Sequence, residues 1–256
     1  MRIATKIAVL FAVVAVMALP PGVARAQVTF ESGATRGPDA VVSVDNGLVA
    51  KGQGGSATSA LTTIYDNLSA TAQLTVSSTD LTALWGDELF TTGTGLLSTH
   101  KFTIFNAGTS AGALLTATIS VSFWDNTLTT LLGTYSGGIN FGAGLLPNQF
   151  SVITASGLDP FLILLNSTDV IVIQGLSGKT GPATRCGIVV FDPVLIGASP
   201  TSMFIKAATI GGGVPGFKIL GPGGNPAADP GHQVLVNEPP VSTSAKSWGT
   251  LKRLYR

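Results

Sequence analysis

Apolar and polar side chains alternate strictly along the segment Ala113–Trp124. Successive side chains of a β-strand point to opposite faces, so this pattern predicts a strand with one buried face and one face toward water. A helix would spread the Thr and Ser residues around its whole circumference. In the predicted strand, Trp124 falls on the polar face, in line with the Thr and Ser residues that precede it.

Shorter segments of the same kind recur along the chain, rich in Val, Ile, Phe and Thr and bounded by Gly, Pro, Asn or Asp. They are residues 41–44, 62–65, 71–77, 89–91, 97–105, 129–135, 149–154, 161–165, 170–174, 187–191, 203–206, 217–220 and 233–236. Segments 161–165 and 170–173 are apolar on both faces, which predicts that they run through the middle of the molecule. The pattern predicts an all-β fold, a single jelly-roll-like β-sandwich of about a dozen antiparallel strands.

The N-terminus carries the features of a secretory signal peptide. Arg2 and Lys6 precede an unbroken apolar run over 7–18, and Ala24 and Ala26 supply the small residues of a cleavage site. The apolar run is too short to span a membrane as a helix. We therefore expect cleavage after Ala26 and secretion, to the medium or the cell surface.

The rest of the chain divides into a domain and a tail. The predicted strands lie within residues 27–240, and the Pro- and Ser-containing stretch 237–247 is typical of a linker. We define a β-sandwich domain over 27–240 and a basic aromatic tail over 241–256. The most apolar later stretch, 161–173, contains Asn and Asp, so the mature chain is predicted to have no transmembrane segment.

The amino-acid composition excludes some classes of function and of site. Only 11% of the 256 residues are charged, with 14 Lys and Arg against 13 Asp and Glu. A chain this close to neutral lacks the basic surface that nucleic-acid binding requires. The single Cys excludes an intrachain disulfide and a thiolate-only metal cage.

The sequence matches two catalytic motifs, but the predicted structure around each differs from the structure that the motif requires. Gly108-Thr-Ser110-Ala-Gly112 fits the nucleophile turn of serine hydrolases, which requires a following helix, yet the best predicted strand follows it. A loop of a hairpin is the simpler interpretation. The glycines at 211, 213 and 216 fit a dinucleotide motif, but Pro215 and a predicted strand follow. We therefore expect no enzymatic activity.

The scarce His and Cys residues point to structural roles. His100 lies within a predicted strand beside apolar residues, which indicates a hydrogen-bonded core or edge position. His232 follows Asp229 in a predicted loop, where a shared metal site is a weaker alternative. Cys186 follows Arg185, which would lower its pKa, but without a His partner an inert thiol is the favoured interpretation.

Aromatic–acidic motifs end two of the predicted strands. Tyr65-Asp66-Asn67 and Trp124-Asp125-Asn126 each place an aromatic ring beside a carboxylate and an amide, a combination suited to sugar recognition. These six residues form the candidate ligand site. The carboxylates of Asp66, Asp87, Glu88 and Asp125 can instead supply oxygens to a structural Ca²⁺, and no other cofactor is expected. The simpler alternative is that Asp-Asn closes a turn and the aromatic ring covers the sandwich edge.

The order of these motifs resembles a group of exported bacterial β-sandwich proteins that carry a Pro-Glu-Pro C-terminal sorting signal. The resemblance rests on Tyr65-Asp-Asn, Trp85-Gly-Asp, Phe123-Trp-Asp and Pro230-Gly-His-Gln-Val, and it covers residues 62–240. It implies a location at the cell surface or in the matrix. This chain has Asn237-Glu-Pro-Pro without the following sorting helix, so the resemblance does not extend to that anchoring route.

These features lead to one functional expectation and two alternatives. The expectation is an exported, non-enzymatic protein with a structural, adhesive or binding role, whose partners are glycans or other envelope and matrix components. The first alternative is a carbohydrate-binding module, and the second is an extracellular hydrolase with two acids across a cleft.

Overall fold

The computed structural model describes residues 28–44, 61–78, 83–200, 202–206, 217–220 and 229–237. The predicted signal peptide, the C-terminal tail and the glycine motif at 211–216 lie outside these ranges. Within the ranges, no helix has the length and apolar character needed to cross a membrane.

The described chain is almost entirely β-structure, which confirms the predicted fold class. A single 3-10 turn, Asp159–Phe161, is its only helical element. The strands are β1 (Val28–Glu31), β2 (Thr35–Arg36), β3 (Ala40–Val44), β4 (Leu61–Asp66), β5 (Thr71–Ser78), β6 (Leu84–Phe90), β7 (Gly95–Asn106), β8 (Leu114–Asp125), β9 (Leu131–Leu145), β10 (Gln149–Ser156), β11 (Leu164–Leu165), β12 (Asp169–Thr180), β13 (Cys186–Asp192), β14 (Ser202–Lys206), β15 (Phe217–Leu220), β16 (Asp229–Pro230) and β17 (His232–Asn237).

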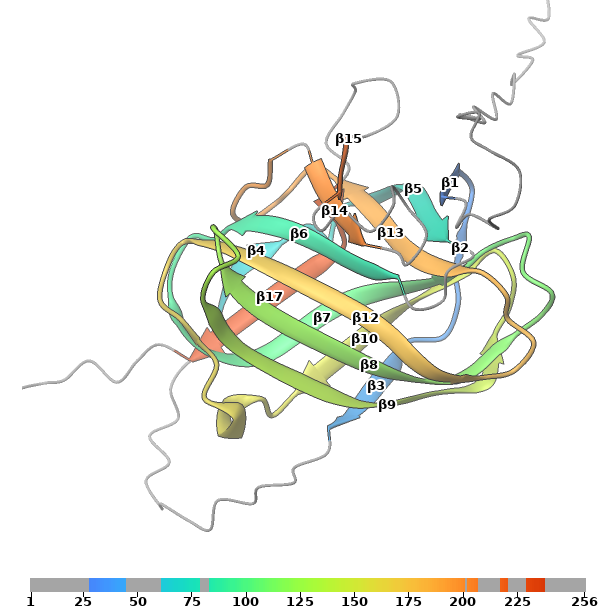
Figure 1. Ribbon diagram of the computed structural model, residues 1–256, viewed down its shortest axis with the longest axis horizontal. Helices are drawn as coiled ribbons and strands as arrows, with labels where there is room; N and C mark the ends of the chain where they lie inside the picture. Colours follow the sequence, from blue (N-terminus) through green and yellow to red (C-terminus); the bar gives the residue numbers. More distant parts are fainter. Residues whose placement is uncertain are drawn as a thin grey trace, which may run out of the picture.

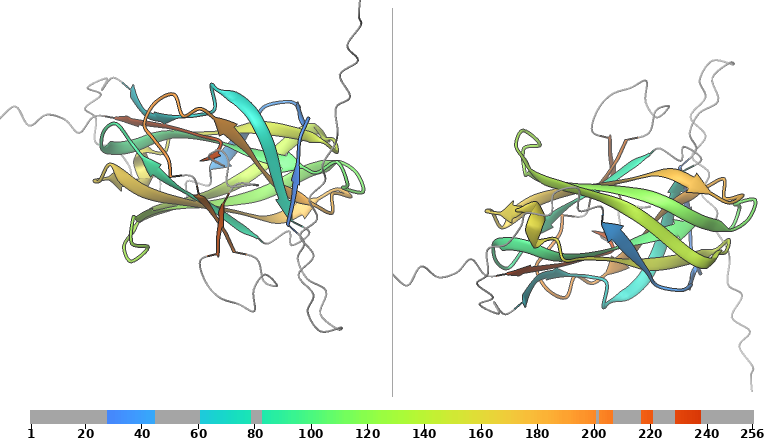
Figure 2. Two further views of the ribbon diagram at one scale, coloured as in Figure 1. Left: turned by 90° about the horizontal axis from the view of Figure 1, so that it is seen from above. Right: turned by 90° about the horizontal axis from the view of Figure 1, so that it is seen from below.

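The strands form two packed layers (Figures 1 and 2). In sheet A, β7 is central, flanked by β10 and β11 on one side and by β17 and β13 on the other, with β4 beyond β17 and β5 beyond β13. In sheet B the order is β9, β8, β12, β6, β14, β15. The strand β12 thus lies in the middle of its layer, as its two apolar faces predicted.

The two layers are connected along both sides. On one side, β3 pairs with β10 of sheet A through Ala40 and Val41, and with β9 of sheet B through residues 42–44. On the other side, Ile196 bridges to Asp66 of β4 and Ala198 bridges to Phe90 of β6. The molecule is therefore a sandwich closed along both sides, like a flattened barrel.

The predicted antiparallel pairing holds among the described strands except for two pairings of β10. The strand β10 is parallel to β2 and β3, so the sheet is mixed. The strands β4 to β9 lie between β3 and β10 in the sequence, so no hairpin joins β3 to β10, and the two strands can run in the same direction.

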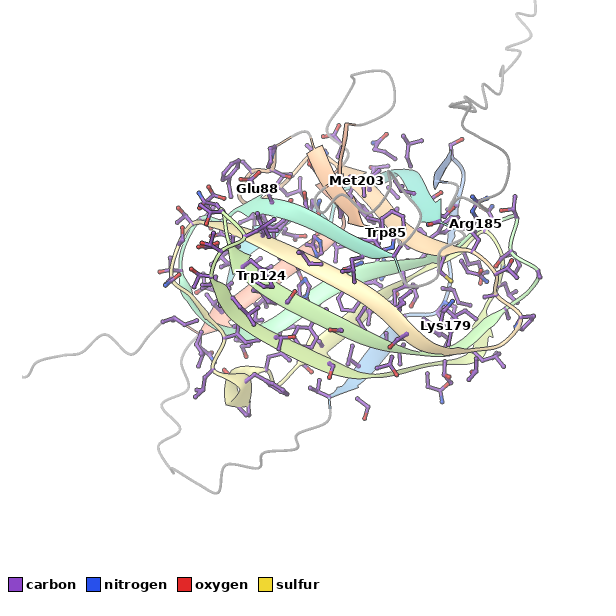
Figure 3. All side chains as sticks on the ribbon, in the orientation of Figure 1. Trp85, Glu88, Trp124, Lys179, Arg185 and Met203 are labelled. Carbon is purple, nitrogen blue, oxygen red and sulfur yellow. The ribbon has the colours of Figure 1, made fainter. Side chains whose placement is uncertain are left out.

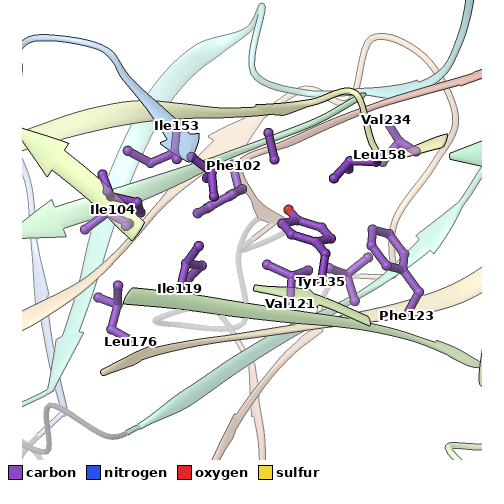
Figure 4. Close-up of a cluster of buried hydrophobic side chains, with 14 of the residues drawn as sticks. Phe102, Ile104, Ile119, Val121, Phe123, Tyr135, Ile153, Leu158, Leu176 and Val234 are labelled. Atoms are coloured by element: carbon purple, nitrogen blue, oxygen red, sulfur yellow. The ribbon is translucent and has the colours of Figure 1, made fainter. Parts of the chain in front are cut away.

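The main hydrophobic core fills the space between the layers (Figure 4). Sheet A contributes Phe102, Ile104 and Ile153, and sheet B contributes Ile119, Val121, Phe123 and Tyr135. A second, smaller cluster lies on the other face of sheet A around Phe105, Phe150 and Phe191. Alternation along each strand thus separates buried from exposed side chains, as the sequence pattern predicted.

Two local predictions are wrong. Segment 161–165 is not a central strand: Pro160 initiates the 3-10 turn, Leu162 adopts a left-handed conformation (φ 54°), and only Leu164 and Leu165 pair. Leu162 is consequently 73% exposed. In β8, a register shift between Leu114 and Thr116 turns Leu115 outward, whereas the alternation had placed it inward.

Candidate functional site

The structure separates the two aromatic–acidic motifs. Tyr65-Asp66-Asn67 ends β4 of sheet A, and Trp124-Asp125-Asn126 ends β8 of sheet B. Tyr65 and Asn67 are fully buried and Asp66 is 6% exposed, whereas Trp124 and Asp125 are half-buried and Asn126 is exposed. The expectation that the motifs form one ligand site is therefore replaced by two sites of different character.

The Tyr65 motif is structural. The Asn67 side-chain amide donates to the carbonyl of Pro230 at 2.9 Å, and its oxygen accepts the backbone N–H of His232 at 2.7 Å. Asp66 accepts hydrogen bonds from the Ser69 hydroxyl and the Gln233 amide. These bonds fix the turn after β4 against the start of β17, the turn-closing role that was the simpler alternative.

The Trp124 motif opens onto the outer face of sheet B. Outward residues of β8 and β9 are paired across the strands as Thr116–Asn140, Thr118–Gly138, Ser120–Ser136 and Ser122–Thr134. The outer face of β8 and β9 is thus built mostly of small polar residues. At one end of it, the row Glu88–Ile171–Trp124–Leu131 runs across four neighbouring strands.

The Trp124 indole is held in place on this face. Its Nε1–H donates to the Ser122 hydroxyl at 2.8 Å, two residues earlier on the same strand. Its cross-strand neighbour Ile171 also points outward, yet is only 2% exposed, so flanking side chains must cover it. The indole therefore packs along the sheet and remains half-buried, as the predicted position on the polar face implies.

Acidic and amide groups lie beside the indole. Asp169 accepts a hydrogen bond from the Asn126 amide at 2.8 Å, and Asp169 pairs with Phe90, which is 37% exposed. Glu88 lies in the same row as Trp124, and both are found at the same end of the molecule in Figure 3. We call the group Glu88, Phe90, Ser122, Trp124, Asn126 and Asp169 the Trp124 surface.

Asp125 has a different role from its neighbours. Its carboxylate accepts the Thr129 N–H and hydroxyl and the Thr127 hydroxyl, which closes the turn between β8 and β9. Desolvation acts to raise the pKa of Asp125, but hydrogen bonds from Thr130 and Thr129 outweigh it and lower that pKa below its usual value. Asp125 shapes the rim of the Trp124 surface without joining it.

The four residues predicted to bind Ca²⁺ do not converge. Asp66 and Asp125 are engaged in their turns, Asp87 points into the interior and Glu88 points outward. Within the described ranges, no three His, Cys, Asp or Glu side chains are grouped to hold a metal ion. The set Asp66, Asp87, Glu88 and Asp125 is therefore not a single Ca²⁺ site.

The two histidines meet in the core, beside Tyr135. His100 Nε2 lies 3.0 Å from His232 Nδ1, and His100 Nδ1 lies 2.7 Å from the Tyr135 hydroxyl. The ring planes differ by 17° with centroids 5.2 Å apart, the geometry of an in-plane N–H···N bond between rings set edge to edge. Desolvation lowers the pKa of both histidines, to about 3 for His232. The predicted core role of His100 is confirmed, and His232 binds His100 rather than a metal shared with Asp229.

Ser110 lies in the loop that precedes β8, and its side chain is engaged there. Its hydroxyl accepts the N–H groups of Thr184 and Arg185, and the strand β8 follows, as expected. The loop joins sheet A to sheet B, so it is not a hairpin loop. Cys186 is buried, and desolvation raises its pKa to about 11, which makes it the inert thiol that was favoured.

A groove of about 580 Å³ lies where β3, β8 and β9 meet, lined by Val41, Thr116, Thr118 and Asn140 and by a single acid, Asp39. It continues the polar face of sheet B away from Trp124. Comparisons of this chain with protein-family models, curated proteins and solved structures find no match.

Proposed function

We propose that this protein is exported and acts outside the cell as a non-enzymatic binding protein, with an adhesive or structural role at the cell surface or in the matrix. We further propose that the Trp124 surface contacts carbohydrate there. The observation that supports the second step is the half-buried indole, hydrogen-bonded to Ser122 on the outer face of sheet B, with carboxylate and amide groups beside it.

The chemistry of sugars fits this surface. One face of a pyranose ring carries C–H groups that pack on an aromatic ring, while its hydroxyls seek carboxylate and amide partners. The hydrogen bond between Trp124 and Ser122 restricts the indole before any ligand arrives. Because the side chain is already ordered, binding loses less conformational entropy than it would with a free rotamer.

The hydrolase alternative has less support. Glycoside hydrolysis needs two accessible acids on opposite sides of a cleft. The groove beside β3 has one acid, and Asp87 and Asp229 are both buried. A catalytic role would need substrate access to that buried pair.

The test is depletion of the protein by insoluble polysaccharides and envelope preparations, with and without Ca²⁺. We expect saturable binding to at least one glycan, and Trp124→Ala to weaken it at least about 5-fold, since stacking platforms contribute about 1–3 kcal/mol. Leu131→Ala, in the same row, is the matched control and should keep affinity within about 2-fold. Unchanged binding by Trp124→Ala would refute the proposal, and a large loss of stability would mark Trp124 as packing instead.

A further inference from the structure

Four polar side chains from distant parts of the sequence meet where the second side of the sandwich closes. Tyr65 comes from β4, Asp87 from β6, Ser199 from the segment that crosses between these strands, and Asp229 from β16. The Ser199 hydroxyl lies 3.4 Å from Asp87 Oδ1 and 3.1 Å from the carbonyl oxygens of Glu88 and Pro200. It is also close enough to Tyr65 and Asp229 to act on their pKa values.

Three oxygen atoms in this group lack a hydrogen-bond partner among the described residues. They are Tyr65 Oη, Asp87 Oδ2 and Asp229 Oδ1. Ser199 lies near all three groups, but its single proton serves only one acceptor at a time. Tyr65 and Asp87 are 0% exposed and Asp229 is 1% exposed, so water outside the molecule does not satisfy them. Unpaired buried oxygens of this kind require a compensating partner.

The electrostatic surroundings are acidic. The charged groups acting most strongly on Asp87 are Asp229 and Glu88, and Asp192 acts on Asp229, so no cation is among them. Two buried carboxyl groups without a cation are stable only if protonated or if they bind a metal ion.

We propose that Asp87 and Asp229 bind one Ca²⁺ ion, with the Tyr65 and Ser199 hydroxyl oxygens completing the side-chain ligands. Two carboxylates balance the charge of a divalent ion, and every donor is a hard oxygen, which Ca²⁺ and Mg²⁺ prefer over softer nitrogen or sulfur ligands. The carbonyls of Glu88 and Pro200 lie beside Ser199 and extend the oxygen set toward the six to eight that Ca²⁺ takes. Such an irregular mixture suits Ca²⁺ better than Mg²⁺, which demands near-octahedral geometry.

The ion would lie where the crossing segment already joins β4 of sheet A to β6 of sheet B by backbone hydrogen bonds. The crossing segment touches β4 and β6 through isolated bridges, and at Gly197 an added Cβ would lie 2.4 Å from the Phe90 carbonyl and 3.0 Å from the Tyr65 ring. Ca²⁺ held by β6, β16 and this segment fixes sheet A against sheet B along the closing side. None of the proposed side-chain ligands belongs to the Trp124 surface. Glu88 does belong to it, but contributes only its backbone carbonyl here, so the ion stabilises the fold without contacting the glycan.

Calorimetric titration of the metal-stripped full chain with CaCl₂ tests this assignment. We expect one Ca²⁺ per chain and a melting temperature about 5–10 °C higher at about 100 times the Kd. Asp87→Asn and Asp229→Asn each remove a buried acid without changing shape, so both should fold and bind Ca²⁺ at least about 10-fold more weakly. Asp125→Asn is the control, because that acid lies in the β8–β9 turn, and it should bind Ca²⁺ as the unaltered chain does.

Three results would overturn the proposal. Absence of heat and of any thermal shift at millimolar Ca²⁺ would mean that Asp87 and Asp229 are simply protonated. Unaltered Ca²⁺ binding by the double variant Asp87→Asn/Asp229→Asn would place the ion elsewhere. Equal affinity for MgCl₂ would refute the assignment to Ca²⁺.

Discussion

The buried histidine pair makes stability depend on pH in a way that can be calculated. His100 and His232 are neutral in the folded protein, because burial lowers the pKa of both, but in the unfolded chain they titrate near 6.5. Below about pH 6.5 the histidines of the unfolded chain bind protons, whereas those of the folded protein stay neutral. Stability from this pair is therefore fully present above about pH 6.5 and is lost as the pH falls toward the folded pKa.

The magnitude follows from the unfolded titration. Lowering the pH from about 7.5 to about 5 reduces the free energy of unfolding by about 2 kcal/mol for a histidine with a folded pKa of about 3. In the Ca²⁺-free protein used for this measurement, Asp87 and Asp229 act in the opposite direction, since their raised pKa values favour the protonated folded state as the pH falls. The total pH dependence therefore mixes two signs, and one histidine must be isolated by a variant.

His232→Asn isolates it, because the side-chain amide offers both a donor and an acceptor to His100 Nε2 and does not titrate. Urea unfolding of both proteins at the two pH values gives the difference. We expect the unaltered protein to lose about 2 kcal/mol more than His232→Asn on acidification. An equal pH dependence in the two proteins would refute the conclusion that His232 is held neutral in the core.

Three further outcomes follow from the packing. Asn67→Ala should destabilise the fold by about 3 kcal/mol in urea unfolding, because Pro230 and His232 lose buried hydrogen bonds; a change under about 1 kcal/mol would contradict this. Gly187→Ala should lower stability by more than about 4 kcal/mol in the same assay, since its Cβ would lie 1.8 Å from the Val76 carbonyl oxygen. Gly138→Ala, whose Cβ would have no atom within 4 Å, should change stability by less than about 1 kcal/mol. Equal effects of the two variants would contradict the strand pairing. Cys186 should react with a thiol reagent only as fast as the protein unfolds, so rapid labelling of the folded protein would contradict its burial.

Alternation predicts a strand well where the side chains are large enough to reveal it. The strand β8 was predicted within one residue because Ile119, Val121 and Phe123 alternate with Ser and Thr. The strand β9 was predicted to end at Tyr135 but continues to Leu145, because glycines at 137, 138, 142 and 144 hide an alternation that Ile139 and Phe141 sustain. Glycine has no side chain to mark a face, so the sequence pattern resembles a loop there.

The candidate site residues also differ in how far the sequence predicts them. The outward position of Trp124 follows from counting along one strand, but Tyr65 lies in β4, where no alternation indicates a face. Phe90 and Asp169 join Trp124 only through the register of β6, β12 and β8, which a single sequence does not reveal. Asp87 and Asp229 meet only because the sandwich closes between β4 and β6, a contact that no local pattern indicates.

The claim that the Trp124 surface contacts carbohydrate is tested most directly by the indole N–H signal of Trp124 in an NMR titration. The Trp124→Ala spectrum identifies that signal, and buried Trp85 supplies an internal reference. With a glycan selected by depletion, we predict that the Trp124 signal shifts in a saturable manner while the Trp85 signal stays in place. Saturable binding that leaves the Trp124 signal unmoved would contradict the account.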